Sequence, residues 1–88
     1  MNTLAELEQA LSVLDPISLT IDDDSALHAG HAGNNGGGHY RVAIVSTAFS
    51  GLPLLQRHRL VYDAASALMP SAIHALSIQA KAPEELAD

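Results

Sequence analysis

Histidine is the residue type in this sequence best suited to chemistry, because its imidazole titrates near neutral pH and is the commonest metal ligand in proteins. The five histidines stand at positions 28, 31, 39, 58 and 74. The chain contains no cysteine, so by itself it offers no disulfide, thiol nucleophile or thiolate metal site. A soft-metal cluster bound through these histidines would therefore need sulfur ligands from a partner.

Length and charge limit the framework that positions these histidines. The 88 residues, 48% of them hydrophobic, suffice for one small domain over residues 1–88. Four Lys and Arg residues against ten Asp and Glu residues give a formal net charge of −6, which disfavours nucleic acid as a partner. No apolar run approaches the roughly 20 residues of a membrane span, and the sequence does not begin like a signal peptide. We expect a soluble cytoplasmic protein, either a monomer or a weak homodimer.

Two stretches have the spacing of helices with one buried face. The first covers residues 4–14, where leucines recur at three- and four-residue steps after a capping-box sequence. The second begins near Pro53, a residue suited to the first turn of a helix. Its apolar stripe runs from Leu54 to Leu68 and includes His58. A third, short helix is expected at residues 83–87.

Three stretches alternate between apolar and polar residues, as strands with one packed face do. They are residues 17–21, 39–46 and 73–80. Residues 25–38 hold five of the six glycines and are predicted to form an exposed loop. Residues 48–51 are predicted to form a turn.

The resulting order of elements predicts an α+β fold, in which two helices cover one face of a three-stranded mixed sheet. The second and third strands are joined through a helix, and such crossovers are by strong default parallel and right-handed. Their starting ends then lie together, so the loop and His74 share one edge of the sheet. His31 or His28 could approach His74 there, and two imidazoles would provide half of a metal site.

Each histidine also has a purely structural interpretation that spacing alone leaves open. His74 can be a partly buried strand residue whose ring bonds a nearby carbonyl. His28 and His31 can be solvated loop residues. His39 and His58 fit packing positions with satisfied rings.

A small basic patch, Arg57, His58 and Arg59, is predicted on the second helix. It could meet phosphates or the acidic side chains of a protein, or it could be a solvated face. So few cations support only weak, salt-sensitive phosphate binding. The glycine-rich loop lacks the Gly-Lys-Ser/Thr of a phosphate loop, and no nucleophile elbow occurs. The sequence therefore predicts a protein that is not an enzyme.

Four motifs resemble those of the BolA family. They are HAGHAG at 28–33, HYRV at 39–42, QRHRLVY at 56–62 and HALSI at 74–78. The similarity extends over residues 3–86, and the combination of the Arg-His-Arg helix with the following His-Ala-Leu strand is specific. This resemblance implies a class II KH-like fold of order α-β-β-α-β-α, which agrees with the order obtained from periodicity.

The resemblance also implies a function: partnering monothiol glutaredoxins in handling [2Fe-2S] clusters, in iron-sulfur protein maturation or iron regulation. In such complexes the glutaredoxin cysteine and glutathione supply sulfur, and the BolA-like protein supplies nitrogen. The matching positions here are His74 and His31, with His28 as an alternative to His31. No cluster is expected in the isolated chain. The alternative function is that of a DNA-binding transcriptional regulator, acting through Arg57, His58 and Arg59.

Overall fold

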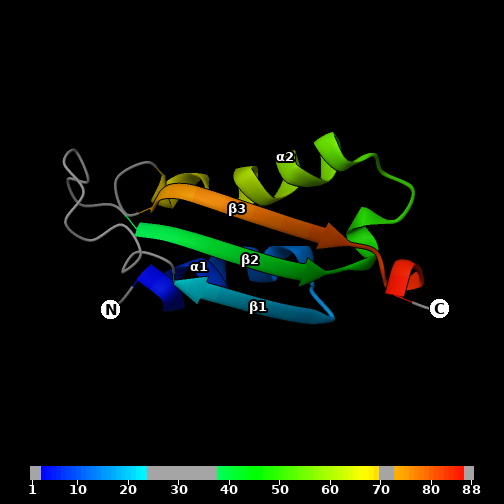
Figure 1. The fold of residues 1–88 in the computed structure, drawn as a ribbon, viewed down its shortest axis with the longest axis horizontal. Helices are drawn as coiled ribbons and strands as arrows, with labels where there is room; N and C mark the ends of the chain where they lie inside the picture. Colours follow the sequence, from blue (N-terminus) through cyan, green and yellow to red (C-terminus); the bar gives the residue numbers. More distant parts are fainter. Residues whose placement is uncertain (1–2, 24–37, 70–72, 87–88) are drawn as a thin grey trace.

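The computed structural model describes residues 3–23, 38–69 and 73–86 of the chain (Figure 1). It contains two α-helices, three β-strands and several 3₁₀ turns. In chain order they are α1 (Thr3–Leu11), η1 (Ser12–Leu14), β1 (Ser18–Asp23), β2 (Gly38–Val45), η3 (Thr47–Phe49), α2 (Leu54–Ala64), η4 (Ser66–Leu68), β3 (Ile73–Lys81) and η5 (Pro83–Leu86).

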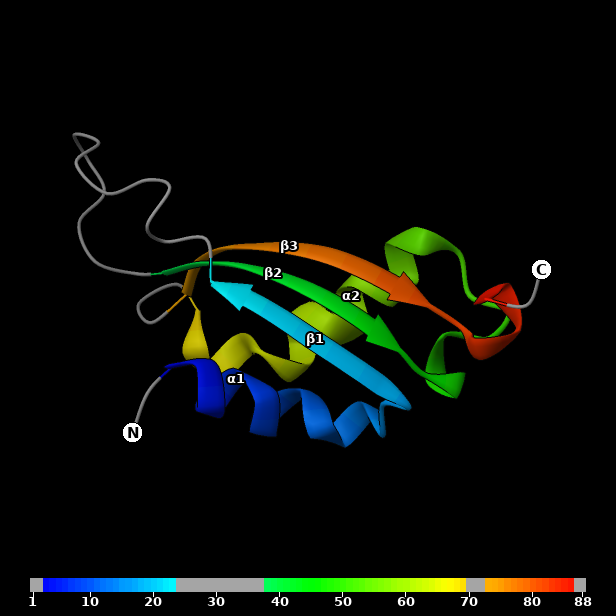
Figure 2. The same ribbon diagram turned by 60° about the horizontal axis from the view of Figure 1, so that its bottom comes forward.

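The three strands form one mixed sheet in the order β1-β2-β3. β1 pairs with β2 in antiparallel fashion, and β2 pairs with β3 in parallel. Both helices lie against the same face of the sheet, and no described helix covers the other face (Figure 2). The predicted α+β fold, with its parallel second and third strands, is confirmed.

The core lies between the helices and the covered face of the sheet. Along β2, Tyr40, Val42 and Ile44 are buried, whereas Arg41 and Ala43 are exposed, as alternation predicts. The main apolar side chains that pack with these three strand residues are Leu7, Leu11, Phe49, Val61, Ala65, Ile73, Leu76, Ala80 and Ala82. The strand pattern therefore determines which face carries the helices.

The helix ends differ from their predicted positions. α1 stops at Leu11, and a 3₁₀ turn carries the chain to Asp15, whose left-handed backbone (φ 52°) ends it. α2 stops at Ala64 and is likewise followed by a 3₁₀ turn. Apolar residues three apart suit both kinds of helix, so the spacing does not reveal where one changes into the other.

The segment predicted as a simple turn after β2 contributes to the core. Phe49, in η3, is fully buried. Ser46, also buried, fixes the segment: its hydroxyl accepts a hydrogen bond from the Ala48 N–H at 3.0 Å and donates one to the Leu14 carbonyl at 2.6 Å. The connection between β2 and α2 is therefore tied both to itself and to the end of the first helical segment.

Candidate functional site

His74 is the second residue of β3, at an irregularity in the sheet. Gly38 pairs with Ile73 and His39 pairs with Ala75, so the register passes over His74. Irregularities in strand pairing are over-represented next to active sites. The backbone thus sets His74 apart from the regular alternation that continues from Ala75 to the end of the strand.

The ends of three segments meet beside His74. Gly38, the first residue of β2, has Ile73 as its register partner, and Asp23, the last residue of β1, pairs with Tyr40. Asp23 and Gly38 flank residues 24–37, which lie outside the described residues. The predicted shared edge is therefore confirmed for the strands themselves.

The predicted ligands His28 and His31 lie outside the described part of the chain. Metal binding by these two residues and His74 stays a prediction. Within the described residues, no group of three or more His, Cys, Asp or Glu side chains could hold a metal ion. A metal at this edge would need ligands beyond those that residues 3–23, 38–69 and 73–86 supply.

His39 is a further histidine at the sheet edge where β2 and β3 begin. The sequence alone suggested only a packing role for it. It is half-buried, and it alternates with the buried Tyr40 and therefore lies towards the helix-free face of the sheet. Its register partner is Ala75, the residue next to His74. The parallel pairing thus brings these two histidine positions close in space, although 34 positions separate them in the sequence.

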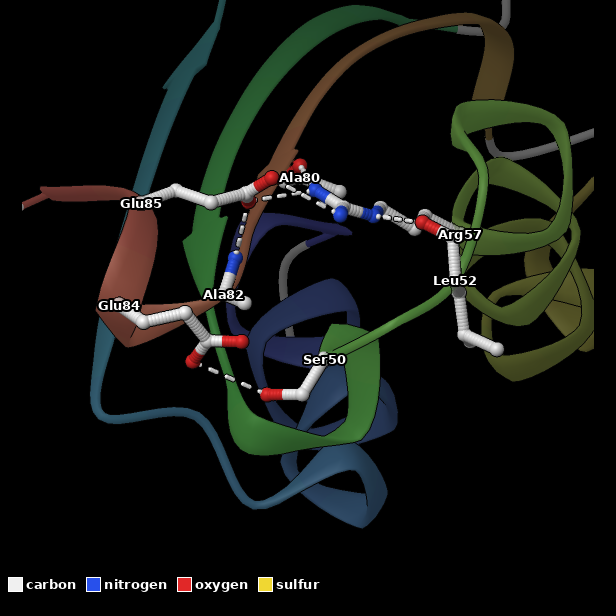
Figure 3. A network of polar contacts seen from close by, with 7 residues as sticks. All are labelled: Ser50, Leu52, Arg57, Ala80, Ala82, Glu84 and Glu85. Carbon is white, nitrogen blue, oxygen red and sulfur yellow. Dashed lines mark hydrogen bonds and ion pairs between the residues drawn. The ribbon is translucent and has the colours of Figure 1, made fainter.

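Arg57, predicted to belong to an exposed basic patch, is instead buried, with 7% of its surface exposed. Its two terminal nitrogens donate to the two carboxylate oxygens of Glu85, at 2.6 and 2.9 Å (Figure 3). Its Nε donates to the Leu52 carbonyl at 2.7 Å, and its Nη1 also donates to the Ala80 carbonyl at 3.1 Å. The Ala82 N–H completes the network by donating to Glu85 at 2.7 Å.

This network stabilises the charged forms of both Glu85 and Arg57. The hydrogen bonds from Arg57, followed by the one from the Ala82 N–H, lower the pKa of Glu85 to about 2, and the carboxylate in turn raises the pKa of Arg57. Arg57 therefore fastens η5 to α2 and β3 rather than presenting its charge to a partner. The predicted patch is reduced to the half-buried His58 and the exposed Arg59, whose binding role stays a prediction.

The buried stripe of the second helix agrees with the prediction at Val61 and Ala65 but not at its start. Leu54 is 63% exposed, and Arg57 is the buried residue one turn before Val61. The burial of Arg57 could have been predicted from helical spacing, because Arg57 lies four residues before Val61 and shares its helical face. The prediction instead placed Leu54 on the buried face because Leu54 is apolar.

Three curated proteins are similar to this chain. SufE-like protein 1, chloroplastic/mitochondrial, of Arabidopsis thaliana is 47% identical over an alignment of 79 residues, and the match covers 83% of this chain and 21% of that protein. BolA-like protein 1 of Mus musculus is 48% identical over 81 residues, 92% of this chain and 56% of that protein. The DNA-binding transcriptional regulator BolA of Escherichia coli is 31% identical over 71 residues, 81% and 66% of the two chains. The chain thus spans about a fifth of the length of the Arabidopsis protein and just over half the length of the mouse protein.

The relatives bear on two further predictions. Two of them are named as a BolA-like protein and as a regulator, not as enzymes, in agreement with the prediction from the sequence. None of the described helices is long and apolar enough to cross a membrane. The plant relative is named for the chloroplast and mitochondrion, so a cytoplasmic location stays a prediction.

A solved structure and a family model agree on what the fold is. BolA1 from Arabidopsis thaliana matches with a TM-score of 0.83 at 41% identity, over 97% of this chain and 96% of that chain. The family model for BolA-like proteins matches residues 7–85, which include β1, β2, α2 and β3. The chain therefore belongs to the BolA family.

Proposed function

We propose that this protein is a partner of a monothiol glutaredoxin, with which it holds or passes on a [2Fe-2S] cluster. The observation that carries the proposal is the position of His74 at an irregularity in the pairing of β2 with β3, at the sheet edge where β1 ends and β2 begins. This geometry allows a histidine of the segment between β1 and β2, His31 or else His28, to serve beside His74.

The available donor atoms fit a shared cluster rather than a cluster of this chain alone. The chain has no cysteine, and its described residues contain no three-residue metal-ligating group. The sulfur ligands would come from the glutaredoxin cysteine and from glutathione. Imidazole nitrogens on one iron raise the reduction potential of a [2Fe-2S] centre, as they do in Rieske proteins.

The proposal is tested by assembling the cluster anaerobically on a monothiol glutaredoxin with glutathione and following visible circular dichroism as this protein is added. The expected result is a new spectrum that saturates at one protein per glutaredoxin. An unchanged spectrum at excess protein would exclude cluster sharing with that glutaredoxin.

The variant His74→Ala is expected to weaken the new spectrum and shorten the lifetime of the cluster, because one nitrogen ligand is lost while the sulfur ligands remain. Ser77→Ala is the matched control, since Ser77 is exposed on the same strand, and it should behave like the wild type.

His31→Ala is expected to act like His74→Ala, and a larger effect of His28→Ala would assign the second nitrogen to His28 instead. A His74→Ala spectrum and lifetime identical to the wild type would contradict the assignment.

DNA binding is the second candidate function, favoured by the name of the Escherichia coli relative. The structure weakens the chemical case, because Glu85 already neutralises Arg57 and the chain carries a net charge of −6. We expect no duplex DNA binding at micromolar protein and about 150 mM salt, where specific regulators bind far more tightly. The measurement is a fluorescence anisotropy titration. Saturable binding that Arg59→Ala abolishes would establish DNA binding in its place.

A further inference from the structure

A groove of about 400 Å³ is lined by residues of α2 and of the last part of β3, the strand whose other end carries His74. Leu54 and His58 line it from the helix, Ile78 and Lys81 line it from the strand, and Glu85 lines it from η5. Its volume falls within the range of about 300 to 1,000 Å³ found for ligand sites.

The backbone of β3 turns hydrogen-bonding groups towards this groove. The carbonyls of Leu76 and Ala80 accept hydrogen bonds from side chains of α2, at 3.0 and 3.1 Å, and therefore point away from β2. The carbonyl of Lys81 points the other way, because it accepts from the Ser46 N–H at 3.0 Å. Since these directions alternate along a strand, the N–H and C=O of Ile78 also face outward, between the two capped carbonyls.

Two basic residues, Arg57 and Lys81, line the groove in a chain whose net charge is −6. Arg57 is neutralised by Glu85, the carboxylate that lines the groove. Lys81 remains as a basic residue of the lining, to which α2 also contributes His58. This arrangement favours an occupant that carries a carboxylate.

Apolar side chains are exposed at the same end of the molecule. Leu54, Leu55 and Leu86 are 63%, 65% and 51% exposed. Leu54 lines the groove itself, and Leu86 lines a smaller hollow to which Lys81 also contributes. Large exposed aliphatic residues beside an accessible strand edge are typical of sites for extended peptides, which gain affinity from main-chain hydrogen bonds and specificity from side-chain pockets.

We infer that this groove binds an extended segment of another protein, in which a large aliphatic side chain stands next to Asp or Glu. The segment adds to the edge of β3 at Ile78, its aliphatic side chain packs against Leu54, and its carboxylate lies near Lys81 and His58. Nucleic acid does not fit these leucines and the overall negative charge. The inference is independent of the cluster proposal, because the groove and His74 lie at opposite ends of β3.

The test is a selection of random dodecapeptides displayed on phage against the whole protein, followed by anisotropy titration of the best synthetic peptide. The expected peptides combine Asp or Glu with Leu, Ile, Val or Phe, and their affinity falls at least about tenfold in Leu54→Asp, as expected for a central contact. Val13→Asp is the matched control: Val13 is 74% exposed and does not line the groove, so it should bind as the wild type does. His74→Ala should also retain binding.

Four results would overturn the inference, and the first three concern the selected peptides. They are a failure to enrich any peptide, enrichment of peptides without acidic residues, and equal binding to Leu54→Asp and the wild type. A fourth is a concentration-dependent dimer that Leu54→Asp dissociates, since it would assign the groove to a second copy of this chain. In isotope-edited NMR, the amide resonance of Ile78 should shift when the selected peptide binds.

Discussion

Phe49→Ala is expected to destabilise the protein by about 3 to 5 kcal/mol, the usual cost of removing a buried aromatic side chain and leaving a cavity. Phe49 is fully buried and belongs to the main core, although it stands in a short connection. Domains of this size have a total stability of only about 5 to 15 kcal/mol. The variant should therefore melt more than about 10 °C below the wild type, as measured by thermal circular dichroism.

The control for this prediction lies in the same turn. Thr47 is exposed, and Thr47→Ala should change the free energy of unfolding by no more than about 0.5 kcal/mol. Nearly equal melting temperatures for Phe49→Ala and Thr47→Ala would mean that the turn does not contribute to the core as the structure indicates. A selective loss for Phe49→Ala would establish the turn as part of the core that positions α2.

The strands could be predicted closely from the sequence because their signal is local. Burial on alternate positions is a property of each strand by itself, and Tyr40, Val42 and Ile44 display it without reference to the rest of the chain. The parallel pairing also follows from connection rules. The bulge at His74 could not be predicted, because it depends on how β2 and β3 adjust to each other.

The burial of Phe49 could not be predicted for a related reason. The neighbouring Ser50 and Gly51 favour a turn, and Gly51 indeed has a positive φ of 77°. Turn chemistry determines the path of the chain but does not determine what its side chains meet. Whether an aromatic residue in a turn is buried depends on tertiary contacts, here those of the core beneath η3.

The burial of Arg57 in an ion pair with Glu85 could not be predicted from its neighbours in the sequence. Three adjacent cationic or titratable residues indicate a basic surface when they are read locally. The partner that decides the outcome, Glu85, is 28 positions away. Helical spacing relates Arg57 to Val61 and separates it from Arg59, so the two arginines face in different directions. Only the fold shows that one of them is internal.

Arg57→Ala is expected to lower the melting temperature by several degrees at neutral pH. The substitution removes four hydrogen bonds: two to the Glu85 carboxylate and one each to the carbonyls of Leu52 and Ala80. Bonds to charged groups stabilise more than neutral ones, and buried carbonyls left without a donor are costly. Arg57→Lys should restore only part of the loss, because an ammonium cannot form the bidentate pair. Arg59→Ala, which removes an exposed arginine two residues away, is the control and should melt with the wild type.

The stabilising effect of the ion pair between Glu85 and Arg57 should decrease in acid. In the folded protein the pKa of Glu85 is lowered from its ordinary value of 4.5 to about 2. The carboxylate therefore stabilises the fold fully at pH values above 4.5 and loses this contribution as the pH falls towards 2. Glu85→Gln cannot lose a charge that it does not carry. Its melting temperature should therefore lie below that of the wild type at pH 7 and approach it at about pH 2 to 3. If the difference between the two proteins were the same at both pH values, the stabilising interaction would not be the ion pair between Glu85 and Arg57.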